Sequence, residues 1–168
     1  MTTCDNYTNT YTSINCTSNT DIYTTHNSDI LIKRNDTAQI FHFNECVKSV
    51  HNNEEVVLVV ADKCFFVSDL NTPLFKKVDN IDIKTFKLFK NLLTLVDSEQ
   101  KLHAFKIDTN ITPLNISALT EGDTFIDSCI NDTTVFAITS EGYGYSISHT
   151  YTQPAETLIT SEILDNNT

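Results

Sequence analysis

One pattern of short strands recurs four times along this chain of 168 residues. Each copy has a first strand, a polar gap, a central apolar strand, a polar turn and a third strand. The copies begin near Ile14, Val50, Phe86 and Ser128, at spacings of 36, 36 and 42 residues. A unit this small cannot cover its own apolar faces, so such units stack on one another in repeat proteins. The chain is therefore expected to be a repeat protein.

The strand content of each copy predicts an all-β fold. The apolar stretches 56–60 and 92–96 do not alternate with polar residues, which indicates strands covered on both faces. We interpret 84–95 as two strands as well, because it aligns with the other copies. Predicted strands lie in the centre of each copy at 20–24, 56–60, 92–96 and 134–138, in third place at 30–32, 64–67, 102–105 and 143–147, and in fourth place at 38–43, 73–78, 113–119 and 154–159.

Four strands in about 40 residues are typical of a β-propeller blade. The sequence thus predicts a small or partial β-propeller of about four blades, with four antiparallel strands per blade. We expect a flexible segment at 1–9, a single repeat domain at 10–164 and a tail at 165–168. Pro73, Pro113 and Pro154 recur at spacings of 40 and 41 residues and are expected at the steps between blades, since proline lacks a ladder donor.

The last predicted strand raises the question of how the array ends. The segment 154–164 has no blade of its own in this interpretation, and pairing it with the first blade would close a four-bladed ring and remove two open edges. The alternative is an open arc of blades, completed by a partner or belonging to a longer protein.

The charge of the chain limits its partners. The formal net charge is −11 and the sequence pI is about 4.6, a balance that repels nucleic-acid phosphates and anionic membranes. We therefore expect protein partners rather than direct nucleic-acid or membrane binding. Seven of the 11 basic residues nevertheless lie between 76 and 106. They form either a solvated strand face or, through Lys84, Lys87 and Lys90, a docking patch for an acidic protein or RNA.

The five cysteines show no metal-type spacing. Cys64 and Cys129 lie in apolar surroundings and are expected to be small buried hydrophobic residues. An odd number of cysteines, together with an N-terminus that has neither a basic start nor an apolar core, favours a reducing compartment. We predict a cytoplasmic or nuclear protein.

The fourth copy carries a family resemblance. Val135-Phe136-Ala137-Ile138-Thr139, Ser140-Glu141-Gly142 and Tyr145-Ser146 resemble repeats of the regulator of chromosome condensation, or RCC1-like, propellers. The resemblance implies a rigid platform for protein partners and extends over residues 10–150. The chain departs from the family in having 3 glycines, four copies rather than seven blades, and no histidine in the central strand. No residue can be matched to nucleotide exchange.

Catalytic motifs are missing from the sequence. The glycines form no phosphate-binding loop, and the five histidines are dispersed. Glu54 and Glu55 are adjacent and would point to opposite faces of a strand, so a solvated turn is expected there. Tyr143 and Tyr145 either present an interface or pack between blades.

We therefore predict a non-enzymatic protein-interaction module or regulatory subunit that acts through its loops, without cofactor or metal. The alternatives are an adaptor that uses the lysine-rich third copy and a hydrolase with a site in the propeller channel.

Overall fold

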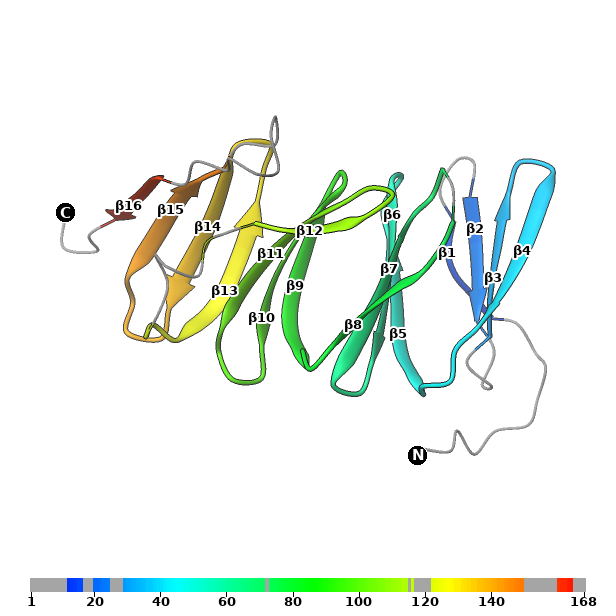
Figure 1. Cartoon of the computed structure of the whole chain (residues 1–168), viewed down its shortest axis with the longest axis horizontal. Helices are drawn as coiled ribbons and strands as arrows, with labels where there is room; N and C mark the ends of the chain where they lie inside the picture. Colours follow the sequence, from blue (N-terminus) through cyan, green and yellow to red (C-terminus); the bar gives the residue numbers. More distant parts are fainter. Residues whose placement is uncertain are drawn as a thin grey trace.

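Four antiparallel sheets of four strands each follow one another along the long axis of the molecule (Figure 1). The computed structural model describes residues 12–16, 20–24, 29–71, 73–114, 116, 122–149 and 160–164. Within each sheet the strands pair in chain order. Each sheet is thus one blade, and the predicted all-β propeller with four strands per blade is confirmed. Among the described residues, no helix is long and apolar enough to cross a bilayer.

The blades correspond to the four copies of the sequence pattern. Blade 1 comprises β1 (Thr12–Cys16), β2 (Thr20–Thr24), β3 (Asp29–Arg34) and β4 (Thr37–His42). Blade 2 comprises β5 (Val47–Asn52), β6 (Val56–Ala61), β7 (Cys64–Asp69) and β8 (Lys76–Asp79). Blade 3 comprises β9 (Ile83–Phe89), β10 (Leu92–Asp97), β11 (Leu102–Ile107) and β12 (Ile111–Pro113). Blade 4 comprises β13 (Phe125–Ile130), β14 (Thr134–Thr139), β15 (Gly144–Ser148) and β16 (Thr160–Leu164).

Asparagine and aspartate close equivalent turns in different blades. The Asn53 side-chain oxygen accepts hydrogen bonds from two backbone N–H groups before β6, and Asn131 does the same before β14. Asp69 and Asp108 each accept a hydrogen bond from the N–H group two residues later, at the end of the third strand. Such Asx turns fix the chain where one strand ends and the next begins. The high asparagine and aspartate content therefore serves the repeat.

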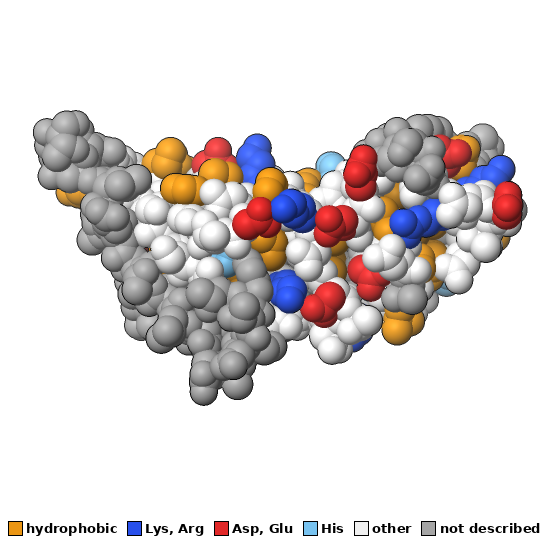
Figure 2. Space-filling model, turned by 90° about the horizontal axis from the view of Figure 1, so that it is seen from above, with side chains coloured by type: hydrophobic (Ala, Val, Ile, Leu, Met, Phe, Trp, Pro, Cys, Tyr) orange, Lys and Arg blue, Asp and Glu red, His pale blue; other side chains and the backbone are white. Residues whose placement is uncertain are grey.

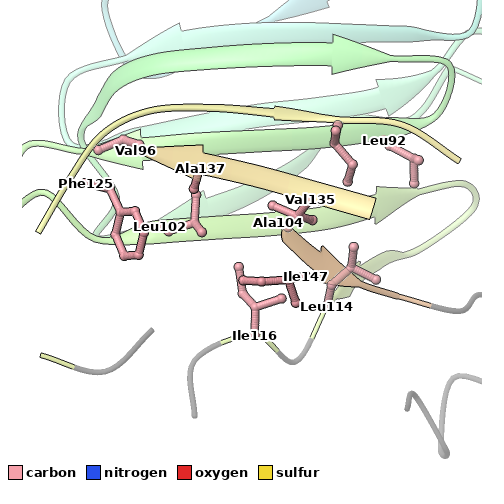
Figure 3. Packing of buried hydrophobic residues seen from close by; sticks show 11 residues of the cluster. Leu92, Val96, Leu102, Ala104, Leu114, Ile116, Phe125, Val135, Ala137 and Ile147 are labelled. Atoms are coloured by element: carbon pink, nitrogen blue, oxygen red, sulfur yellow. The ribbon is translucent and has the colours of Figure 1, made fainter. Parts of the chain in front are cut away.

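Three hydrophobic cores lie between the four blades. All six residues of β6 and of β10 are buried, because each of these strands has a blade on either side. Figure 3 shows the core between blades 3 and 4, where side chains of β10 and β11 meet side chains of β13, β14 and β15. This core contains Leu92, Val96, Leu102, Ala104, Phe125, Val135, Ala137 and Ile147. The covered central strands predicted from the sequence are thus confirmed.

The array is an open arc and not a closed ring. The first and fourth blades lie at opposite ends of the molecule (Figure 1), and β16 pairs with β15 of its own blade. The predicted pairing of the last strand with blade 1 is therefore wrong. The physical reason is that four consecutive strands complete each blade, so blade 1 needs no strand from the C-terminus.

Two further expectations need correction. Pro73 lies inside blade 2, between β7 and β8, and Pro113 ends β12. Proline thus occurs at the fourth, edge strand, where a missing N–H donor costs no ladder hydrogen bond, rather than at the step between blades. Pro154 lies outside the described residues. The fourth strand predicted at 113–119 is displaced, since β12 covers Ile111–Pro113.

The cysteines differ from the sequence-based expectation. Cys64 is buried as predicted, whereas Cys129 is exposed, because it lies on the face of blade 4 that no other blade covers. Cys46 is disulfide-bonded, so it is not one of the free thiols.

Candidate protein-binding groove

An aromatic groove lies where blade 1 meets blade 2, on the outer strands. Its floor comes from Phe41 and Phe43 at the end of β4, from Phe66 on β7 and from Phe75 just before β8. The rings pack edge to face, with centroid distances of 4.9 Å for Phe41–Phe75 and 4.7 Å for Phe43–Phe66. This arrangement is favourable for aromatic pairs and holds the rings rigidly. The groove encloses about 370 Å³.

The rim of the groove is partly apolar and mainly acidic. Leu74 projects beside the phenylalanines and is 69% exposed. Lys77 lies 6.0 Å from the centre of the Phe66 ring, and its ammonium group contacts Asp79 at 3.0 Å and Glu45 at 3.1 Å. The hydrogen bonds to Asp79 and Glu45 raise the pKa of Lys77 above its ordinary value. Glu45 and Lys77 line the groove, and Asp79 lies next to it against Lys77. The three charges together have a net value of −1, which favours a neutral or basic ligand.

The two predicted tyrosines lie in blade 4, far from the groove. Tyr143 is 46% exposed in the turn before β15. Tyr145 is half-buried against Phe125, with ring centres 5.7 Å apart, and its hydroxyl donates a hydrogen bond to Asp123. That hydrogen bond, together with burial, raises the pKa of Tyr145. Tyr145 therefore packs between blades, while Tyr143 presents its ring to solvent.

The three predicted lysines do not form one patch. Lys84, Lys87 and Lys90 are all exposed, but they follow β9 over about 20 Å, given about 3.3 Å per residue in a strand. The Lys90 ammonium group is 2.8 Å from the carboxylate of Asp132 and lies over the Phe89 ring. Four lysines of the basic stretch 76–106 contact carboxylates: Lys77, Lys90, Lys101 and Lys106. Their charge is therefore already balanced locally.

The polar groups within the blades serve structural roles. Asp97 accepts hydrogen bonds from the backbone N–H groups of Glu99 and Lys101 at 2.9 Å and lies 2.8 Å from a ring nitrogen of His103. Thr94 and Ser128 join blades 3 and 4 through a buried hydrogen bond of 3.0 Å. Glu54 and Glu55 are exposed in a turn, as predicted. In the part of the chain that the structure describes, no three His, Cys, Asp or Glu side chains are grouped as metal ligands.

Sequence reasoning missed the groove. Phe41 and Phe43 belong to one blade and Phe66 and Phe75 to the next, and only the stacking of the two blades brings them together. One available signal was the pair Phe41 and Phe43. Two aromatic residues spaced by two at the end of an outer strand lie on one face of that strand. Leu74 was a second signal, since it stands next to Phe75 in the connection before β8.

Comparisons with known proteins identify the class of fold. No protein-family model matches the sequence, and no curated protein sequence matches it significantly. Similar solved structures include Kluyveromyces lactis Hsv2, with a TM-score of 0.55, 13% identity and coverage of 90% of this chain and 60% of that chain. The HIRA fragment 644–1017 is similar with a TM-score of 0.52 and 10% identity, over 89% of this chain and 49% of that chain.

Prp20p from Saccharomyces cerevisiae, a member of the RCC1 family, is a further similar structure. Its TM-score is 0.51 and its identity 10%, with coverage of 78% of this chain and 42% of that chain. The chain spans about half the length of these propeller proteins. The similarity supports the propeller fold, but the match to RCC1-like repeats themselves is not confirmed by a family model.

Proposed function

We propose that this protein is a non-enzymatic interaction module that binds a protein segment in the aromatic groove between blades 1 and 2. The observation that carries the proposal is the rigid floor of four phenylalanines beside the exposed Leu74. Apolar and aromatic side chains that stay accessible beside a concave surface favour insertion of an anchor side chain from a partner.

The charges around the groove define the ligand further. Glu45 lies at the rim, Asp79 lies next to it in an ion pair with Lys77, and the whole chain has a formal charge of −11. An acidic surface attracts a basic partner and accelerates its association. The ligand is therefore a segment with one large apolar side chain flanked by lysine or arginine. The similar protein Prp20p has binding properties to Gsp1p and histones, which supports a protein partner in general terms. Location in the cytoplasm or nucleus stays a prediction.

Peptide binding tests this function. A library of peptides with an apolar anchor and basic flanks is screened against the full chain by fluorescence polarisation. We expect Leu74→Asp to weaken the best peptide at least tenfold, because it places a charge where the anchor becomes desolvated. Tyr143→Asp is the matched control, since Tyr143 is also exposed but lies in blade 4. Equal loss with both variants, or loss with the Tyr143 variant alone, would move the binding site away from the groove.

The lysine-based alternative predicts a different result. Reversal of Lys84, Lys87 and Lys90 to glutamate should abolish binding of an acidic protein or RNA if these residues form the docking patch. We expect no such dependence, because Lys90 is already paired with Asp132.

A further inference from the structure

The outer face of blade 4 is an apolar surface at positions that are buried in the preceding blades. Phe136 in β14 is equivalent to Leu58 in β6 and Thr94 in β10, which are both 0% exposed, yet Phe136 is 36% exposed. Ile138 is equivalent to Val60 and Val96 and is 49% exposed. In blades 2 and 3 this face receives the next blade. Blade 4 thus exposes the face with which blades 2 and 3 each pack against the next blade. We call such a contact between two blades an interblade joint.

Two neighbouring residues extend this surface. Cys129, opposite Phe136 in the strand register, and Ile126 are both exposed. Cys129 lines a shallow cavity of about 200 Å³ together with Phe136 and Ile138, and Ile126 precedes Asp127, another residue of its lining. Figure 2 shows hydrophobic side chains beside this end of the array, and acidic and basic side chains interspersed over its middle. An apolar surface of this kind on a propeller face indicates an interaction site.

Blade 1 carries the other half of such a joint. Tyr23, Leu31 and Ile40 are neighbours in the strand register and lie on the face turned away from blade 2. Tyr23 and Leu31 are equivalent to Val59 and Phe66, the residues with which blade 2 packs against blade 1. Ile40 is 62% exposed. The face that would receive a preceding blade is therefore apolar, with Tyr23 and Leu31 half-buried and Ile40 exposed.

We propose that two copies of this chain form one closed eight-bladed ring, with blade 4 of each copy stacked on blade 1 of the other. Three joints of the same kind already hold the arc together, and the proposed contact continues them at both ends. The chain covers between 42% and 60% of the similar propeller chains reported above, so two copies supply the length of a complete ring.

The symmetry of the contact supports a second copy as the occupant. A head-to-tail contact that closes after two copies forms two identical joints and leaves no blade face exposed. A pairing of two fourth blades would leave both first blades uncovered. Asp127 on the blade 4 face and Lys33 on the blade 1 face are both exposed and carry opposite charges, and Lys33 also has Asp21 as its neighbour in the strand register. This inference is independent of the proposed peptide groove, which lies on the opposite side of blade 1.

Solution mass tests the proposal. Light scattering after size exclusion should give the full chain a mass of twice its 18.9 kDa at micromolar concentration. The double variant F136D/I138D and the single variant I40D should each give the monomer mass, because each places carboxylates in both joints. Leu74→Asp is the control and should remain a dimer, since Leu74 is exposed to a similar extent but lies away from both end faces. Circular dichroism and thermal melting establish that each variant is folded.

Mixing the variants distinguishes a head-to-tail ring from a face-to-face pair. The F136D/I138D chain keeps an intact blade 1 face and the I40D chain an intact blade 4 face. A mixture of the two should form a heterodimer through one joint, with a dissociation constant at least tenfold higher than that of the unmodified protein. Cys129 should react with a maleimide several-fold more slowly in the dimer than in the monomeric variants, as followed by peptide mass mapping.

Three results would overturn the proposal. The first is a monomer at all accessible concentrations with freely reactive Cys129. The second is a dimer that F136D/I138D disrupts and I40D does not, which would indicate fourth-blade pairing. The third is a stable complex in which a different protein, and not a second copy, protects Cys129.

Discussion

At the scale of the residue, burial on both sides of the central strands carries most of the stability. Leu93 and Leu95 of β10 are 0% exposed and lie in the hydrophobic core between blades 2 and 3. Leu74 is 69% exposed, although it has the same side chain. The difference lies in the neighbouring blades and not in the residue type.

We expect Leu95→Ala to lower the free energy of unfolding by about 2–5 kcal/mol, the usual cost of removing a fully buried leucine side chain. Leu74→Ala should change it by about 0.5 kcal/mol or less, as for most exposed positions. Urea denaturation followed by circular dichroism measures both values. Similar costs for the two substitutions would be incompatible with the burial described for β10.

The half-buried His51 and the buried His149 make stability dependent on pH. Burial lowers the pKa of His51, which packs against Phe86 at 4.6 Å, and of His149. The unfolded chain then takes up protons near pH 6.5, while the folded protein still holds both rings neutral. Stability is therefore fully present above pH 6.5 and falls as the pH drops below it. The double variant H51Q/H149Q should show a smaller loss between pH 6.5 and 5 in thermal melts, and an unchanged loss would rule out these two groups as the cause.

At the scale of the element, the strands were predictable because each central strand is apolar on both faces and each connection carries asparagine or aspartate. The central strands predicted at 20–24 and 56–60 match β2 and β6 to within one residue. The segment 84–95, which was predicted to form two strands, lies in β9 and β10.

Other features could not be read from the sequence. Whether a face of a blade is covered depends on the presence of a neighbour, so Cys129 resembled a core residue and is exposed. The groove required four phenylalanines from two blades to meet, and their separation along the chain hid the relationship. The last strand was misassigned because its pairing partner, β15, is no better marked in the sequence than β1.

Two turns between strands contain a non-glycine residue with a positive φ angle, which strains the backbone. Lys63, between β6 and β7, has φ = 57°, and Asn35, between β3 and β4, has φ = 52°. A lysine in this left-handed conformation costs about 1–2 kcal/mol, whereas asparagine tolerates it better. We expect Lys63→Gly to raise the free energy of unfolding by about 0.5–1 kcal/mol in urea titrations. Asn35→Gly serves as the comparison and should give a smaller gain; the reverse order would contradict this explanation.

At the scale of the whole molecule, the blades are joined in sequence by hydrophobic cores and by polar links along one edge. Asn53 in blade 2 donates a hydrogen bond of 2.7 Å to the backbone carbonyl of Lys90 in blade 3, and the Lys90 ammonium group reaches Asp132 in blade 4. Among the described residues, the larger contacts between elements of different blades join adjacent blades, as in other repeat proteins. Within the described ranges, the outer faces of blade 1 and blade 4 pack against no other blade. The proposed assembly uses these two faces.

The central claim is that four blades stack in chain order as an open arc, and contacts between methyl groups test it most directly. Nuclear Overhauser spectra of the methyl-labelled F136D/I138D variant should connect Val135 and Ile147 of blade 4 with Leu92 and Val96 of blade 3. They should connect no residue of blade 4 with Leu31 or Ile40 of blade 1. Contacts within one chain between blade 4 and blade 1, or the absence of those between blades 3 and 4, would contradict the open arc.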